Sequence, residues 1–195
     1  MNSAEGIYQF VNKISELSFQ TWSSVLSHAT EVELKKGEYF IKEGQVSKEM
    51  GFLTKGVVRS YYTSNEGNEY NKTIFVAPNL IGSYVSLITG QPNRLPQQAL
   101  TDCTVTTIPI SIIENLSKDQ IEVERLRRKI AEMFFVLKEK RELEMALLQA
   151  EERYLIFRKE YPDVEQLIPQ YHIASYLGIS ATQLSRIRKK MSTQS

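Results

Sequence analysis

Residues 168–191 read IPQYHIASYLGISATQLSRIRKKM, and this order of residue types predicts two short helices joined by a tight turn. Pro169 suits the first turn of a helix, where a missing N–H costs no hydrogen bond. Gly178 suits the left-handed position that ends a helix, and Ser180 suits the N-cap of the next one. The three-residue turn 178–180 is typical of a helix-turn-helix that binds DNA.

The second predicted helix carries small and polar side chains at its start and basic side chains toward its end. In the major groove Gln can pair with adenine and Arg with guanine, while Lys and Arg also bind phosphate. We therefore predict that the motif binds double-stranded DNA, reading bases with residues 182–186 and contacting phosphate with residues 188–190. The predicted contacts are Gln170, Ser180, Ala181, Thr182, Gln183, Ser185, Arg186, Arg188, Lys189 and Lys190. The alternative is a helical hairpin whose basic end is merely solvated.

Upstream of this motif, apolar spacing predicts a long helix over 119–148 and a second helix over 149–161. The second helix ends before Pro162, because a residue that precedes proline is pushed out of the helical region. Apolar residues of the long helix step by three and four positions, which is a heptad seam and predicts a dimer interface. The predicted interface residues are Val123, Leu126, Ile130, Met133 and Leu137. The alternative is an amphipathic helix that lies on its own sheet.

Residues 30–109 have the pattern of short strands separated by Gly, Asn and Pro, and residues 3–29 have helical spacing. The sequence Asn-Glu-Gly-Asn at 65–68, between two apolar runs, predicts a hairpin. Short strands with turns at this spacing indicate a sandwich or a barrel.

The composition argues against several classes of protein. The net charge is only +1, but residues 166–195 contain no Asp or Glu, so the basic character is local. The single cysteine, Cys103, excludes a disulfide within the chain and a cysteine cluster for zinc or iron–sulfur, and we expect it to be buried in a strand. His28 and His172 are far apart in sequence and are expected at helix surfaces or caps. We find no nucleophile–base pair and predict neither a metal site nor an enzyme.

No window approaches the roughly 18 uninterrupted apolar residues that a membrane-spanning helix needs. The N-terminus also lacks the basic start and apolar core of a signal peptide. We therefore expect a cytoplasmic protein that makes no use of a membrane.

Taken in order, these features resemble the Crp/Fnr family of transcription regulators, and the resemblance covers nearly the whole chain. Residues 119–148 are similar to the dimerisation helix of that family, residues 168–187 resemble its helix-turn-helix, and residues 81–99 lie where it has its phosphate-binding cassette. The residues that resemble its cyclic-nucleotide-binding fold are Lys36-Gly37, Glu43-Gly44, Phe52, Gly56 and Arg59. The resemblance implies a homodimer that binds DNA, with RNA polymerase as a further candidate partner.

The implied fold class is α+β: an N-terminal double-stranded β-helix (jelly roll), a long dimerisation helix and a C-terminal all-α helix-turn-helix domain. We place the sensory jelly roll with its N-terminal helices at residues 1–118, the dimerisation helix at 119–148 and the DNA-binding domain at 149–195.

The chain departs from this family at the ligand site. Cyclic-nucleotide binders use a glutamate after the cassette glycine for the ribose hydroxyl and an arginine further on for the cyclic phosphate. Ser83 takes the first place here and Asn93 the second, with Arg94 one residue later. A short hydroxyl cannot replace a carboxylate acceptor, so we predict an unidentified small-molecule effector other than cyclic AMP.

The resemblance implies a ligand pocket formed by Ile81, Gly82, Ser83, Tyr84, Arg94 and Gln97. For Ser83 and Arg94, the alternative is an ordinary turn and a solvated surface charge.

These inferences predict a dimeric, sequence-specific DNA-binding transcription regulator. The alternative is a small-ligand sensor with reduced or lost DNA binding. Members of the family continue past the recognition helix into a two-stranded wing, and few residues follow Met191 here. We therefore expect that the wing is absent or that the recognition helix ends the fold.

Overall fold

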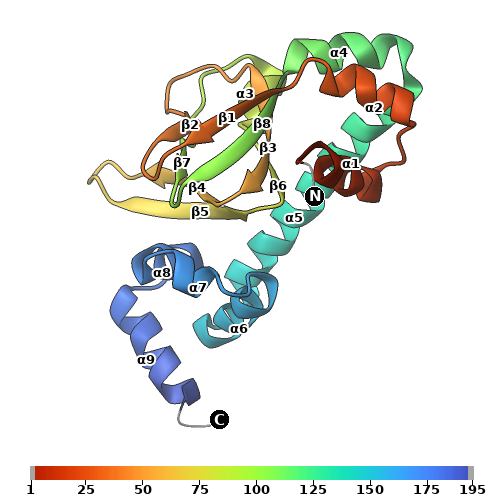
Figure 1. Ribbon diagram of the computed structural model, residues 1–195. Coiled ribbons are helices and arrows are strands. Elements are labelled where there is room, and N and C mark those ends of the chain that lie inside the picture. The colour runs from red at the N-terminus through yellow and green to blue at the C-terminus, as the bar shows by residue number, and fades with distance from the viewer. Residues whose placement is uncertain (1–2, 193–195) are drawn as a thin grey trace.

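Eight strands form the centre of the structure, a computed structural model that describes residues 3–192. They are β1 (Thr30–Leu34), β2 (Tyr39–Ile41), β3 (Glu49–Lys55), β4 (Val57–Thr63), β5 (Glu69–Val76), β6 (Asn79–Ile81), β7 (Gln97–Ala99) and β8 (Cys103–Pro109). They make two four-stranded antiparallel sheets, in the orders β1-β8-β3-β6 and β2-β7-β4-β5 (Figure 1). Strands distant in sequence are neighbours in both sheets, and the expected jelly roll is confirmed.

The β4–β5 pair is the hairpin that the sequence predicts. Its register runs from Val57 opposite Val76 to Thr63 opposite Glu69. The connecting turn is closed by the N–H of Ser64, which donates to the carbonyl of Asn68 at 2.9 Å. The hairpin matters for function because its outer side carries the C-terminal helices.

The space between the sheets is filled by apolar side chains such as Leu53 and Val58, which are completely buried. Cys103 lies among them as a free cysteine, as expected, and burial raises the pKa of its thiol. Gly56 separates β3 from β4 with φ at 96°, and a Cβ there would lie 2.5 Å from the carbonyl oxygen of Asp102. Only glycine fits that position.

Helices cover the outer face of the β1-β8-β3-β6 sheet. They are α1 (Ser3–Ile14), α2 (Phe19–Leu26), α4 (Ile110–Asp119) and the first half of α5 (Ile121–Leu147). Trp22 of α2 and Val123 of α5 share one apolar cluster with Phe52 and Leu80 of the sheet. A short helix, α3 (Tyr84–Thr89), follows β6. Within residues 3–192, no helix is long and apolar enough to cross a membrane.

The long helix begins at Ile121 rather than at the predicted Asp119. Gln120 has an extended backbone (φ −119°, ψ 100°), so the chain changes direction between α4 and α5. The helix ends at Leu147, and Gln149 starts the next helix through a capping box with Glu152.

The C-terminal helices are α6 (Ala150–Glu160), α7 (Val164–Leu167), α8 (Gln170–Leu177) and α9 (Ala181–Ser192). They lie beneath the β4–β5 hairpin in Figure 1. Val57, Ile74 and Leu100 of the jelly roll join the same apolar cluster as Phe157 and Leu184 of these helices. The helical region therefore shares its core with the sheet.

Candidate nucleic-acid interface

Helices α8 and α9 form the predicted helix-turn-helix, and local backbone chemistry fixes the joint between them. Gly178 ends α8 with φ at 70°, and the N–H of Ile179 donates to the carbonyl of Ala174 at 3.0 Å. This is the left-handed helix end that glycine adopts at little cost. The Oγ of Ser180 accepts a hydrogen bond of 3.1 Å from the N–H of Gln183, so Ser180 caps α9 as predicted.

The outer face of α9 carries the predicted base-reading side chains. Leu184 is completely buried and holds α9 against α8, which turns the neighbouring positions toward solvent. Helix α9 runs away from the sheets at the free end of the molecule (Figure 1). The exposed predicted contacts at its start and on α8 are Gln170, Ser180, Ala181, Thr182, Gln183, Ser185 and Arg186. This face is accessible to a groove of DNA.

Two of the predicted phosphate contacts are paired with carboxylates of the same chain. The Nε of Arg188 lies 3.7 Å from a carboxylate oxygen of Glu165, and the Nζ of Lys190 lies 2.7 Å from one of Glu151. The acidic partners lie on α7 and α6, and both residues precede the acid-free stretch that begins at residue 166. These pairs lower the positive potential that α9 offers to phosphate.

Helix α8 is anchored to β5 by polar contacts that no sequence pattern indicated. The side-chain amide of Asn71 donates to the carbonyl of His172 at 2.9 Å, and the N–H of Asn71 donates to the Oγ of Ser175 at 2.9 Å. The expectation that His172 lies at a helix surface or cap is wrong, because α8 packs on the sheet and leaves it 6% exposed. His28 is exposed at the end of α2, as expected.

Burial lowers the pKa of His172 to about 4, with a smaller contribution from the charge of Arg59. The imidazole is therefore neutral at pH 7.

Arg59 extends this contact into the sheet. Its Nη2 lies 2.6 Å from the carboxylate of Glu69 and donates to the Oε1 of Gln98 at 2.7 Å. Its Nη1 donates to the Oδ1 of Asn71 at 3.3 Å, and the guanidinium lies 3.8 Å from the centre of the Tyr61 ring. A buried guanidinium with these partners is satisfied and holds the interface between α8 and β5.

Of the six residues predicted to form a ligand pocket, only Tyr84 lines the apolar cavity beside α5. Gln97 spans Gly82, donating from Nε2 to its carbonyl at 3.0 Å and accepting from its N–H at 2.9 Å. Ile81 is buried between the sheets, and Arg94 is exposed. The ring of Tyr84 instead makes an edge contact with Phe134 of α5. The predicted pocket therefore needs correction, because Gln97 and Ile81 are used in packing the jelly roll.

Asn93 and Ser83 stand at the positions where the family contacts its ligand. Asn93 has a local structural role here, and Ser83 has none. The buried amide of Asn93 donates to the carbonyl of Lys42 at 3.2 Å, and its Oδ1 accepts from the N–H of Leu95 at 3.1 Å. Ser83 precedes α3 and makes no side-chain cap bond to it. These residues provide neither the carboxylate nor the guanidinium for a cyclic nucleotide.

The heptad seam of α5 is divided between the core and the surface. Val123 is completely buried, and Leu126 and Ile130 are nine-tenths buried against the N-terminal helices and the sheet. The interface predicted from these three needs correction, because they belong to the core of one chain, as in the alternative weighed above. Met133 is partly buried in the same cluster, and Leu137 is half exposed.

A different apolar strip is open on the second half of α5. Val136, Leu143 and Leu147 are each more than half exposed and recur at helical spacing on one face. Exposed apolar side chains that gather on one face of a helix are a candidate interaction surface. This strip replaces the first half of the seam as the candidate dimer interface.

Among residues 3–192, no group of three or more His, Cys, Asp or Glu side chains could hold a metal ion.

Comparison with known proteins agrees with this architecture. Residues 31–120 match the family described as Cyclic nucleotide-binding domain. The chain is 28% identical over 170 residues to the Fumarate and nitrate reduction regulatory protein of Vibrio cholerae, covering 79% of this chain and 65% of that relative. It thus spans slightly less than two thirds of the length of this curated relative.

Two solved structures share the fold. FixK2 from Bradyrhizobium japonicum has a TM-score of 0.75 at 23% identity, covering 85% of each chain. A putative transcriptional regulator of the crp/fnr family from Eubacterium rectale has a TM-score of 0.70 at 16% identity, covering 91% of this chain and 85% of that one.

The jelly roll, the long helix and the terminal helix-turn-helix define a protein with a cyclic-nucleotide-binding type of domain joined to a DNA-binding type of motif. The chain is similar in sequence to a curated regulatory protein, and it shares its fold with a structure described as a regulator of the crp/fnr family. The curated relative is named as a regulatory protein, in agreement with the expectation that this chain is not an enzyme.

Proposed function

We propose that the chain is a dimeric, sequence-specific DNA-binding transcription regulator whose effector is not cyclic AMP. The observation that carries the proposal is the exposed start of α9, capped by Ser180 and held outward by the buried Leu184. Such a helix end can enter the major groove, and it carries the amide and guanidinium side chains that read bases there.

Base reading is assigned to Gln183 and Arg186, whose side chains are exposed on this face, with Thr182 and Ser185 beside them. Within residues 3–192 Arg186 makes no ion pair, so its charge is available to DNA. Arg188 and Lys190 would contact phosphate only after exchanging their carboxylate partners, which costs part of the electrostatic gain.

Dimerisation through the strip formed by Val136, Leu143 and Leu147 would relate two recognition helices by a twofold axis. Two such helices meet successive major grooves about 34 Å apart, so the expected operator is a pseudo-palindrome. Binding to such an operator would place the protein in the cytoplasm.

The test is selection of DNA from a randomised library, followed by mobility shift of the selected site with the double variant Gln183→Ala and Arg186→Ala. Each lost base contact is expected to weaken specific binding by about 1–3 kcal/mol. The matched control is Gln91→Ala with Arg94→Ala, two exposed residues of the same types on the jelly roll. Equal affinity of the two double variants for the selected site would remove α9 from base reading.

A second function, a small-ligand sensor with reduced DNA binding, is favoured by the two intrachain ion pairs of α9. Replacing Glu151 by Gln frees Lys190 and is expected to strengthen DNA binding and steepen its salt dependence by about one phosphate contact. If neither the natural chain nor Glu151→Gln binds DNA at low salt, the sensor function is the better description.

A further inference from the structure

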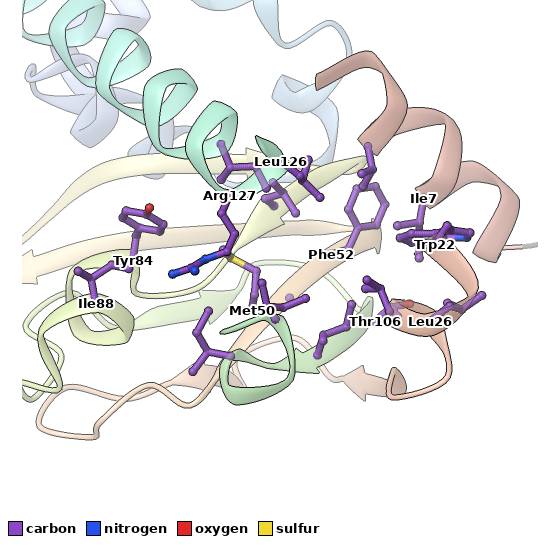
Figure 2. A pocket seen from close by; sticks show the side chains of 18 residues that line it. Ile7, Trp22, Leu26, Met50, Phe52, Tyr84, Ile88, Thr106, Leu126 and Arg127 are labelled. Atoms are coloured by element: carbon purple, nitrogen blue, oxygen red, sulfur yellow. The ribbon is translucent and has the colours of Figure 1, made fainter. Parts of the chain in front are cut away.

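An apolar cavity of about 90 Å³ lies between the N-terminal helices, the outer face of the β1-β8-β3-β6 sheet and the start of α5. Figure 2 shows Ile7 and Trp22 at one end of it and Tyr84 at the other, with Met50 between them. Leu126 of α5 contributes to the same wall. The cavity is on the outside of the jelly roll, and of the six residues predicted to form a ligand pocket only Tyr84 lines it.

The chemistry of the lining selects the kind of molecule that fits. Arg127 is the charged residue among the side chains that line the cavity, and it already has partners. Its Nη1 donates to the Oγ of Ser117 at 2.8 Å and to a carboxylate oxygen of Glu124 at 3.1 Å. An anionic ligand would lose its hydration there and gain no free counter-charge. The occupant that fits is uncharged and apolar.

The size of the cavity limits the occupant further. An apolar protein cavity of about 150 Å³ stays dry and binds benzene or xenon. At about 90 Å³ this cavity is smaller, but Met50 forms part of its wall and an unbranched thioether side chain can change rotamer at low cost. A single aromatic ring therefore fits with a small movement of Met50, whereas a nucleotide does not.

The position of the cavity connects it to the rest of the chain. Leu126 and Ile130 line it from α5, the helix that carries Val136 and Leu143 about two to five turns further on. An occupant that displaces these two side chains shifts α5 against the sheet. The same helix continues to the joint at Leu148 that leads to α6.

We propose that this cavity binds a small neutral aromatic molecule and that its occupancy regulates DNA binding; the second part rests on the proposed function above. The ligand class follows from the carbon lining, the paired state of Arg127 and the volume. The regulatory part follows because side chains of α5 form one wall of the cavity, so that an occupant contacts this helix directly.

Benzene is the probe for binding. With benzene at roughly ten times its dissociation constant, the Tm of the full chain is expected to rise by about 3–6 °C. Leu126→Phe fills the cavity and is expected to abolish this rise, while Leu137→Phe, the same change at a half-exposed position of the same helix, keeps it. Should Leu126→Phe not fold, Ile113→Phe fills the cavity from α4. No rise with the natural chain, or an undiminished rise with a folded filling variant, overturns the site.

The regulatory part is tested by the affinity for the selected DNA site with and without benzene. A change of fivefold or more that is absent in the filling variant supports it, and a smaller change overturns it. If the chain binds no DNA at all, the proposed function and the regulatory part both fail. The Tm rise and its loss in the filling variant would still establish the binding site.

Discussion

The side-chain amide of Asn71 donates a hydrogen bond of 2.9 Å to the backbone carbonyl of His172. This bond joins β5 of the jelly roll to the first helix of the helix-turn-helix. Both residues are buried, and Asn71 also accepts from the guanidinium of Arg59. The sheet, a buried cation and α8 therefore form one connected unit, and the orientation of α9 follows from that of the hairpin.

Replacing Asn71 by Ala removes the partner of the His172 carbonyl and of one Arg59 N–H. Leaving such buried groups unsatisfied is expected to lower the free energy of unfolding by about 1–3 kcal/mol. Urea denaturation measures the loss, and hydrogen exchange should show faster opening of α8 than of β8. Asn115→Ala is the matched control on an exposed surface of α4, where about 0.5 kcal/mol or less is expected. Equal losses in the two variants would show that the contact contributes nothing.

Stability should depend on pH through His172. Its pKa is about 4 in the folded chain and about 6.5 when unfolded, so between these values the unfolded chain binds a proton that the folded chain does not. The free energy of unfolding is therefore unaffected above about pH 6.5 and falls as the pH is lowered toward 4, by at most about 3 kcal/mol.

Carboxylates titrate in part of the same range, so the measured quantity is the difference in slope between the natural chain and His172→Gln. We expect the variant to have the shallower slope between pH 6.5 and pH 4. His28→Gln, which removes an exposed imidazole, is the control. A slope that changes equally in both variants would contradict the assignment to His172.

Two substitutions at the Ser180 cap distinguish an effect on stability from an effect on DNA binding. Ser180→Ala should lower stability by about 1 kcal/mol, because the N–H of Gln183 loses its acceptor. Ser180→Asp should restore that stability, since a carboxylate caps a helix and interacts well with its N-terminus. Its negative charge lies at the face proposed for DNA, so mobility shift should show weaker binding. Natural affinity in Ser180→Asp would place the DNA interface elsewhere.

The open strip on α5 predicts the oligomeric state. Leu143→Glu puts a charge in the middle of the strip and should convert a dimer into a monomer in sedimentation equilibrium. Leu155→Glu makes the same change at a half-exposed leucine of α6 and should leave the dimer intact. A dimer that persists in Leu143→Glu would exclude this strip as the interface.

Features governed by neighbouring residues could be predicted from the sequence. The left-handed end at Gly178, the cap at Ser180 and the β4–β5 hairpin each depend on the conformational preference of a few consecutive residues. The jelly roll pairs strands that are distant in sequence. It was predicted from the order of the features that resemble a known family. The local pattern of short strands and turns predicted only a sandwich or a barrel.

Features that depend on which surfaces meet could not be predicted. The heptad pattern gives Val123 and Leu137 the same periodic position, but only the first is covered by the N-terminal helices. The basic run of α9 is free of acids in sequence, yet Glu151 approaches it from another helix. His172 is buried because a strand one hundred residues away packs against it, and a single sequence holds no signal of that contact.

The apolar cluster that joins Val57, Ile74 and Leu100 to Phe157 and Leu184 has a consequence for exchanging parts between relatives. A chimera that takes α6–α9 from a protein of the same fold inherits half of a packed core and meets a hairpin shaped for different side chains. Swaps that carry the β4–β5 hairpin together with these helices keep both halves matched. In this chain the transferable unit for DNA specificity is therefore discontinuous in sequence, comprising two segments on either side of α5.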